Sequence, residues 1–370
     1  MNNEETTRLI ARRAFLRGGG AMGVGTLAFN QLLSGESAAK NTGPNVPLPG
    51  NFAPRAKSVI FLHMVGAPSQ LDLFDPKPRL HEFHGKPAPA EFIEGKRFAF
   101  LRGHPKMMAS PFKFETLNEG QQISEILPHL KSVAGEIAIV RSMTTEDFNH
   151  APAQMFFHSG LNRIGRPSIG SWVTYGLGSE CSDLPAYVVM VSGGVAGAGA
   201  SLWSNGFLPS VYQGVEFRSD GDPVLFLSNP KGVDRARRRR ILDGIGELNA
   251  LELEQTADPE IRTRMAQYEM AFRMQMSVPE LTDITTEPDE VRAMYGKGTF
   301  AGHCLQARRL VERGVRFVEL YNSTWDHHGG IESNLRKKTR ETDQPIAALI
   351  KDLKMRGLLD ETLIVWGAEF

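Results

Sequence analysis

The chain has 370 residues, long enough for one large domain or two modest ones, and its 41% hydrophobic and 23% charged residues are ordinary for a globular protein. Lys and Arg together number 42, as do Asp and Glu, so the formal net charge is zero. This balance gives no indication of a nucleic-acid partner, which would favour a basic face, but it does not exclude a local basic patch.

The N-terminal segment has the order of parts found in a twin-arginine export signal. Arg12 and Arg13 stand before Phe-Leu and a further basic residue, and the weakly hydrophobic stretch 18–33 and the small residues 37–39 follow. An ordinary amphipathic helix is the alternative, but each of the five glycines between residues 18 and 25 would lower helix stability by about 1 kcal/mol relative to alanine. We therefore expect residues 1–39 to be a twin-arginine signal peptide, which implies recognition by the twin-arginine translocase and a periplasmic or exported location.

A proline-rich linker separates this signal from the first predicted strand. Residues 40–56 hold four prolines and two glycines with few large apolar residues. The unbroken apolar run 58–64 then predicts a central parallel strand that is covered on both faces. No later run approaches the roughly 20 apolar residues of a membrane span, so we expect no stable span after signal removal. We expect residues 57–370 to form one large domain.

The middle of the chain predicts short elements on either side of a large loop. Its expected elements are, in order, helix 123–134, strand 137–140, helix 151–159, strand 185–191, and helices 232–255 and 259–276. Pro128 either kinks the first of these helices or marks its true start. Residues 192–230 are rich in Gly, Ser and Pro, and we expect them to form an inserted loop or small subdomain.

The end of the chain alternates between helices and apolar strands. The order is helix 300–313, strand 315–321, helix 340–356 and strand 362–366. This alternation predicts an α/β fold with a doubly wound, mostly parallel sheet and helices on both faces. Ligands bind such sheets beyond the carboxyl ends of the strands, and that rule selects the residues to consider.

Chemically capable side chains follow four of the predicted strands. They are Asp72 after 58–64, His150 after 137–140, Asp326 and His328 after 315–321, and Glu369 after 362–366. Carboxylates and neutral imidazoles that meet at one rim suit zinc, manganese or a similar divalent ion. Such an ion would polarise an ester oxygen or lower the pKa of bound water toward about 7. We therefore expect these five side chains to lie in one cleft.

Each of these residues also has a structural interpretation. Asp72 can cap a turn, His150 can cap the helix that it begins, and the run from Asp326 to His328 can be a solvated loop. The other histidines are interpreted as structural or surface residues. These are His63, His81, His84, His104, His129, His158 and His303.

Two segments resemble the sulfatases of the alkaline phosphatase superfamily. Residues 150–160 share the Pro and final Gly of the motif C-x-P-S-R-x-x-L-x-T-G, with His150 at the nucleophile position. Residues 359–370 follow the course of L-x-D-N-T-L-V-V-F-x-S-D-[HN]-G. There Glu369 falls at the metal-binding Asp, and Phe370 replaces the second polar residue.

Essentially the whole mature chain is similar to a bacterial family, domain-of-unknown-function family 1501, which looks like a divergent branch of the same superfamily. The matching stretches are 66–78, the Asn149–His150 region, 207–209, Trp325-Asp326-x-His328 and the Glu369–Phe370 ending. The resemblance implies an alkaline-phosphatase-like three-layer fold and export, but no settled activity. Because the family continues with a later segment that carries a final histidine ligand, we expect the sequence to be incomplete at its C-terminus.

Two functions of different classes are consistent with these residues. The first is an exported metal-dependent hydrolase of phosphate or sulfate esters, small or polysaccharide, that uses zinc, manganese or calcium. Its metal ligands would be Asp72, Asp326, His328 and Glu369, and His150 would be a ligand, a nucleophile or an oxyanion contact. The second is a non-catalytic periplasmic or surface binding protein that retains the fold. Val65–Gly66 in place of the sulfatase Asp pair, and the lack of Cys or Ser at position 150, favour the second function.

Overall fold

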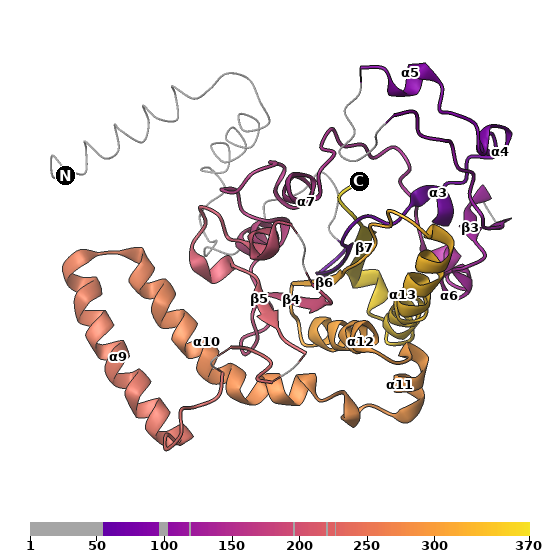
Figure 1. Ribbon diagram of the computed structural model, residues 1–370. Coiled ribbons are helices and arrows are strands. Elements are labelled where there is room, and N and C mark those ends of the chain that lie inside the picture. The colour runs from indigo at the N-terminus through magenta and orange to yellow at the C-terminus, as the bar shows by residue number, and fades with distance from the viewer. Residues whose placement is uncertain (1–54, 96–102, 118–119, 195–196, 220, 226) are drawn as a thin grey trace. The chain divides into compact units, whose positions relative to one another are not determined.

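The computed structural model (Figure 1) describes residues 55–370 apart from 96–102, 118–119, 195–196, 220 and 226. The predicted signal peptide and all but the last two residues of the predicted linker lie outside the described residues. Within the described part of the chain, no helix is both long enough and apolar enough to cross a membrane.

The centre of the fold is a five-stranded sheet in which every pairing is parallel. Its strands, in spatial order, are β5 (Val215–Phe217), β4 (Tyr187–Ser192), β6 (Phe317–Asn322), β1 (Ser58–Met64) and β7 (Thr362–Gly367). Strand β1 has a neighbour on each side, so His63 lies level with Tyr321 on β6 and with Gly367 on β7. The four longer strands are mostly apolar because both faces of the sheet are covered.

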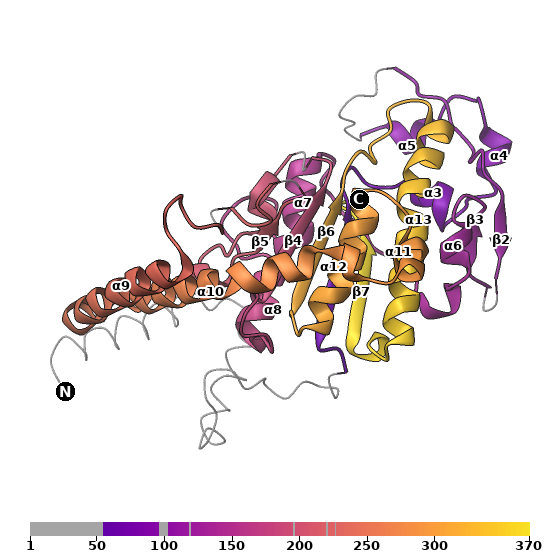
Figure 2. The same cartoon turned by 90° about the horizontal axis from the view of Figure 1, so that it is seen from below.

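Helices cover both faces, so the domain has three α/β/α layers (Figure 2). The covering helices are α12 (Thr299–Glu312) and α13 (Ile331–Met355) on one face, and α7 (His150–Ser159) and α8 (Ile169–Leu177) on the other. Along β1 the side chains alternate between two cores. Ile60 and Leu62 belong to the core under α12 and α13, and Phe61 belongs to the core under α7 and α8. The prediction of a doubly wound α/β fold is confirmed.

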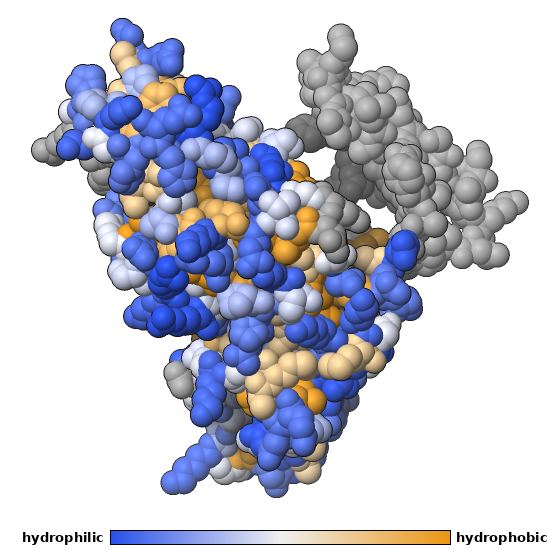
Figure 3. Space-filling view, turned by 90° about the vertical axis from the view of Figure 1, so that its right-hand side faces the viewer, coloured by the Kyte–Doolittle hydropathy of each residue, from blue (hydrophilic) through white to orange (hydrophobic). Residues whose placement is uncertain are grey.

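Further helices and a second, two-stranded sheet complete the described part of the chain. The other α-helices of the described residues are α3 (Gln70–Leu73), α4 (Leu80–Phe83), α5 (Ala90–Ile93), α6 (Pro128–Lys131), α9 (Arg235–Thr256), α10 (Pro259–Thr282) and α11 (Asp289–Tyr295). Strands β2 (Phe114–Thr116) and β3 (Gln122–Ser124) form an antiparallel pair. Hydrophilic side chains cover most of the side on which β3 and α6 lie, with apolar ones in small groups between them (Figure 3).

Helices α9 and α10 form a hairpin that extends away from the sheet (Figures 1 and 2). Two hydrogen bonds from Arg239 on α9 to Glu269 on α10, at 2.9 and 2.6 Å, hold the two helices together. These two helices confirm the helices predicted at 232–255 and 259–276, with differences at their ends.

Two predictions in the middle of the chain are wrong. Residues 137–140 form no strand, because Ile137 packs against the core and its carbonyl accepts a hydrogen bond from the Gln121 side chain (2.7 Å). The helix expected at 123–134 is replaced by β3 and the short helix α6. Helix α6 begins at Pro128, since proline fits the first turn of a helix, where its missing N–H is not needed.

Two further boundaries differ from the sequence prediction. The insertion predicted at 192–230 contains β5, whose three residues are too few to stand out as an apolar run. Helix α13 begins at Ile331, nine residues before the predicted start at 340. In its first turns, Leu335 is the buried apolar residue, so hydrophobic periodicity is weak there.

Candidate functional site

Three adjacent strands bring candidate residues to one rim of the sheet. Strands β6, β1 and β7 are parallel neighbours, so the segments that follow them leave the sheet at the same edge. The backbone N–H of Trp325 donates to the Val65 carbonyl (3.1 Å), which places the segment after β6 against the segment after β1. A Cβ on Gly66, whose φ is +101°, would lie 2.5 Å from the backbone nitrogen of Asp326, so this close approach requires glycine.

The imidazole of His150, the first residue of α7, lies between two carboxylates. Its Nδ1 is 2.9 Å from Oε1 of Glu369, and its Nε2 is 3.1 Å from Oδ2 of Asp326. The same Oδ2 of Asp326 is 2.7 Å from Nε2 of His328. The Glu369 side chain is fully buried, whereas 30% of the His150 side chain is exposed. The structure therefore brings four of the five predicted residues together, and we name them the His150 cluster: His150, Asp326, His328 and Glu369.

Glu369 is held as an anion at the inner end of the His150 cluster. Its Oε1 accepts hydrogen bonds from the Gly66 backbone N–H (3.0 Å) and the Gln154 amide (2.9 Å), in addition to the contact with His150. Its Oε2 lies 3.3 Å from Nε2 of His63. Burial raises the pKa of Glu369, but the contacts with His63 and His150 outweigh burial and bring that pKa down to about 2. An ionised carboxylate only accepts hydrogen bonds, so Nδ1 of His150 carries a proton.

His150 is placed to exchange a proton at its other ring nitrogen. Burial lowers the pKa of His150, yet the hydrogen bonds to Glu369 and Asp326 outweigh burial and raise the pKa above the usual 6.5. Below that pKa both ring nitrogens carry protons, and above it Nε2 can accept one. A partly exposed imidazole that a buried carboxylate holds by its inner nitrogen is the arrangement of a general base or a nucleophile.

Asp72 is the fifth predicted residue, and its side chain contacts a residue of its own turn. It is buried on α3, and its Oδ2 accepts a hydrogen bond from Ser69 Oγ (2.7 Å). This contact stabilises the turn that follows β1. No hydrogen bond or ion pair joins Asp72 to the His150 cluster in the described part of the chain, and its metal role stays a prediction.

The sequence analysis assigns no site role to four buried polar residues, His63, Gln154, His158 and Glu319, of which Gln154 and His63 contact Glu369 directly. Gln154 and His158 follow His150 by four and eight residues, so the three share one face of α7. His63 and Glu319 lie inside strands, on the sheet face that α7 covers. A polar stripe on a helix together with single polar residues inside apolar strands is the signal that could have found them.

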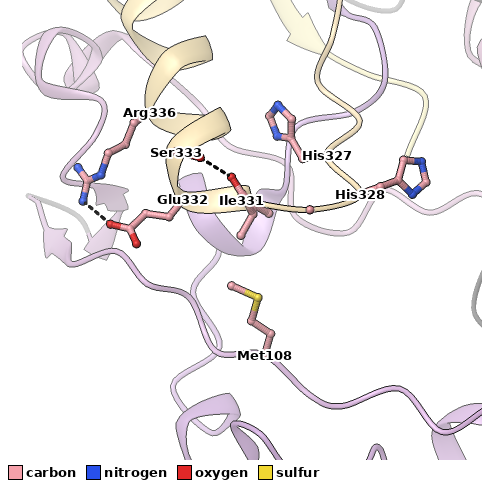
Figure 4. A pocket seen from close by; sticks show the side chains of 9 residues that line it. Met108, His327, His328, Ile331, Glu332, Ser333 and Arg336 are labelled. Carbon is pink, nitrogen blue, oxygen red and sulfur yellow. Dashed lines mark hydrogen bonds and ion pairs between the residues drawn. The ribbon is translucent and has the colours of Figure 1, made fainter.

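An open hollow adjoins the His150 cluster at the start of α13 (Figure 4). Its volume is about 640 Å³, and its lining consists of Met108, the loop 327–330 and the first turns of α13 as far as Arg336. His328 belongs both to this lining and to the cluster, through its contact with Asp326. The hollow therefore offers space for a ligand beside the cluster.

The donor atoms of the cluster are of the types that bind zinc or manganese, but their placement does not suit an ion. Among the residues that the structure describes, no group of three or more His, Cys, Asp or Glu side chains could hold a metal ion. The donors contact one another instead, at 2.7 to 3.1 Å. A bound ion would have to replace these contacts, so the divalent metal stays a prediction.

Comparison with known proteins identifies one family. A family model described as "protein of unknown function (DUF1501)" matches residues 56–370. The match begins two residues before β1 and includes every residue of the His150 cluster. No curated protein and no solved structure matches the chain.

Proposed function

The chain belongs to the family of proteins of unknown function DUF1501, and we propose that it is an exported hydrolase of phosphate or sulfate esters. The observation that carries the proposal is the placement of His150 between the buried Glu369 (2.9 Å) and the more exposed Asp326 (3.1 Å). The resemblance to the sulfatase motif supports it, because His150 stands at the start of a helix, where that motif has its nucleophile.

In this proposal His150 acts through Nε2. Above its pKa, Nε2 takes a proton from a water molecule whose oxygen bonds to phosphorus or sulfur, and the ester oxygen leaves and takes up a proton. Glu369 holds Nδ1–H and stabilises the imidazolium that forms. Direct attack by Nε2, which transfers the phosphoryl or sulfuryl group first to His150 and then to water, is the alternative. Phosphohistidine trapped by quenching in base would identify that alternative.

Two helix starts favour an anionic substrate at this rim. Helix α7 begins at His150 and α13 at Ile331, and neither start has a side-chain capping hydrogen bond. The first backbone N–H groups of a helix and its dipole attract anions. A phosphate or sulfate group in the hollow at the start of α13 would also lie beside His328.

The test is turnover of aryl phosphates, phosphodiesters and aryl sulfates by the purified chain, with chelator and with added zinc, manganese or calcium. Turnover that survives chelation supports the acid–base mechanism of His150. Turnover that requires an ion supports the predicted divalent metal, with Asp326, His328 and Glu369 as its donors and Asp72 as the fourth candidate. Absence of turnover under all these conditions would reject the hydrolase.

A non-catalytic binding protein is the competing proposal. The observation that favours it is the mutual pairing of the cluster, in which carboxylates contact both ring nitrogens of His150. Such a protein would bind a small-molecule or polysaccharide ester without changing it. Saturable binding of an ester without turnover would support this second function.

The rate of hydrolysis is expected to rise with pH through the pKa of His150. The base form of His150 is the reactive form, and contacts with Glu369 and Asp326 raise its pKa, so the midpoint should lie above 6.5. Asp326→Asn removes one of these contacts and should move the midpoint to lower pH. The measurement is kcat/KM against pH for both proteins. A rate that falls with pH over this range, or a midpoint that Asp326→Asn leaves unchanged, would contradict the assignment.

Replacing Arg12 and Arg13 with Lys is expected to keep the chain in the cytoplasm. The paired guanidinium groups are the feature that the twin-arginine translocase recognises, and a lysine ammonium does not reproduce a guanidinium fork. Cell fractionation of the wild-type chain and the Lys variant measures this. A Lys variant that reaches the periplasm in full yield would show that the export assignment is wrong.

A further inference from the structure

A chain of buried polar side chains continues inward from Glu369. Oε2 of Glu369 is 3.3 Å from Nε2 of His63, and Nδ1 of His63 is 3.2 Å from Nε2 of His158. Nδ1 of His158 is 3.1 Å from Oε1 of Glu319, and the other oxygen of Glu319 accepts a hydrogen bond from the Tyr187 hydroxyl. We name His63, His158 and Glu319 the inner chain, and each of them is at most 2% exposed.

The surroundings of the inner chain are aromatic. The Phe61 ring lies 5.4 Å from the His158 ring between centroids, and the rings of Phe157 and Tyr321 lie 5.8 and 5.2 Å from that of His63. Burial of polar and charged groups costs free energy that apolar residues of the same size would not cost. Packing between the sheet and α7 therefore does not account for these three polar residues.

The geometry shows how the inner chain holds Glu369. Nε2 of His63 faces Oε2 of Glu369, and Nδ1 of His63 shares a hydrogen bond with Nε2 of His158. Nε2 of His63 and Oε2 of Glu369 are within ion-pair distance but do not form an aligned hydrogen bond. The hydrogen bond with His158 and the aromatic rings thus fix His63, and His63 attracts Oε2 of Glu369 electrostatically.

We propose that the inner chain consists of positioning residues, which hold Glu369 from inside the protein and thereby fix the ring of His150 at the surface. Glu369 is shared by two histidines, with His150 on Oε1 and His63 on Oε2. Without His63, Oε2 would face aromatic side chains, the carboxylate would rotate, and Nδ1 of His150 would lose its aligned acceptor. Only the kinetic readout of this proposal rests on the proposed function, since the orientation of His150 can be measured without a substrate.

Three substitutions test the positioning role by kinetics. His63→Phe keeps a ring of similar size and removes both nitrogens, whereas His63→Gln keeps a donor near the place of Nε2. We expect His63→Phe to lower kcat by roughly 10- to 100-fold with little change in KM, since a misplacement of about 1 Å can cost that much. His63→Gln should retain most of kcat. His303→Phe is the matched control, because the buried His303 bonds Ser192 and Ser219 (2.8 and 2.9 Å) outside the inner chain, and it should keep kcat.

The second readout is ¹⁵N NMR of the imidazole rings. In the wild-type chain we expect His150 to hold its Nδ1–H tautomer above its pKa, and a scalar coupling to cross the hydrogen bond between His63 and His158. His63→Phe should remove the tautomer preference of His150. Unchanged His150 signals and unchanged kcat in a folded His63→Phe variant would overturn the proposal. If that variant does not fold, lack of the coupling in the wild-type chain would overturn it. If the wild-type protein gives these NMR signals but hydrolyses no ester, the hydrolase is rejected and the positioning role of the three residues stands.

Discussion

His150→Gln is expected to lower kcat/KM for the best ester substrate by about 10²- to 10⁴-fold, the usual contribution of a positioned proton-transfer group. The glutamine amide can still contact Glu369 or Asp326, but it has no atom that takes a proton as Nε2 does. The fold should be retained, because 30% of the His150 side chain is exposed and His150 stands at the first position of α7. Steady-state kinetics together with urea unfolding separate the loss of activity from a loss of stability.

His129→Gln is the matched control for this substitution. His129 is an exposed histidine on α6, and its backbone N–H, rather than its ring, donates to Asp343 (2.8 Å). The same change of side chain there should leave kcat/KM within a factor of two or so of wild type, since exposed substitutions have small effects. Full activity in His150→Gln would contradict the role assigned to His150.

Arg308→Met is expected to lower the free energy of unfolding by about 3–5 kcal/mol, as removal of one partner from a buried ion pair does. Arg308 is buried on α12, with Nε 2.9 Å from Asp352 on α13. Its other nitrogens lie 2.7 Å from Glu287 and 2.7 Å from Glu312. Methionine keeps the apolar stem but removes the buried guanidinium from three carboxylates, which then keep only the more exposed Arg356 and, at Glu287, Arg309 as cationic partners. Urea unfolding of the full chain measures the difference.

Glu312→Gln is the control for the ion-pair prediction, because Glu312 contacts the same guanidinium from a side chain that is 39% exposed. Exposed ion pairs contribute about 0–1 kcal/mol, so this variant should unfold close to the wild-type midpoint. Equal destabilisation by Arg308→Met and Glu312→Gln would contradict the importance of burial at Arg308. The two variants together also measure how much the contacts between α12 and α13, which cover the sheet face opposite α7, contribute to stability.

Where one local signal dominates, the fold could be predicted from the sequence. Strands β1 and β7 are confirmed apolar runs, and Gly160 ends α7 with a φ of 67°. Residues 137–140 carry a similar apolar signal and yet form no strand. The carbonyl of Ile137 accepts a hydrogen bond from the Gln121 side chain, 16 residues away, and a local sequence pattern does not contain that contact.

The candidate site could be predicted only as far as the strand-end rule reaches. That rule correctly selects Asp326 and Glu369, which follow β6 and β7. It selects His150 only through the strand expected at 137–140, which does not form, and the start of α7 is what brings His150 into contact with both carboxylates. His63 and Glu319 escape it because they lie inside strands. Their link to Glu369, direct for His63 and through His158 for Glu319, depends on the register of β1 against its neighbours and on the packing of α7 across the sheet, which are long-range features.

The central claim, that His150 and Glu369 act as one unit in ester hydrolysis, is tested most directly by a double-mutant cycle on kcat/KM. The cycle compares His150→Gln, Glu369→Gln and the double variant with the wild-type chain. Residues that act as a unit are strongly non-additive, because loss of the first already removes what the second supports. We expect the double variant to be no slower than His150→Gln alone. A double variant whose loss equals the product of the two single losses would contradict it.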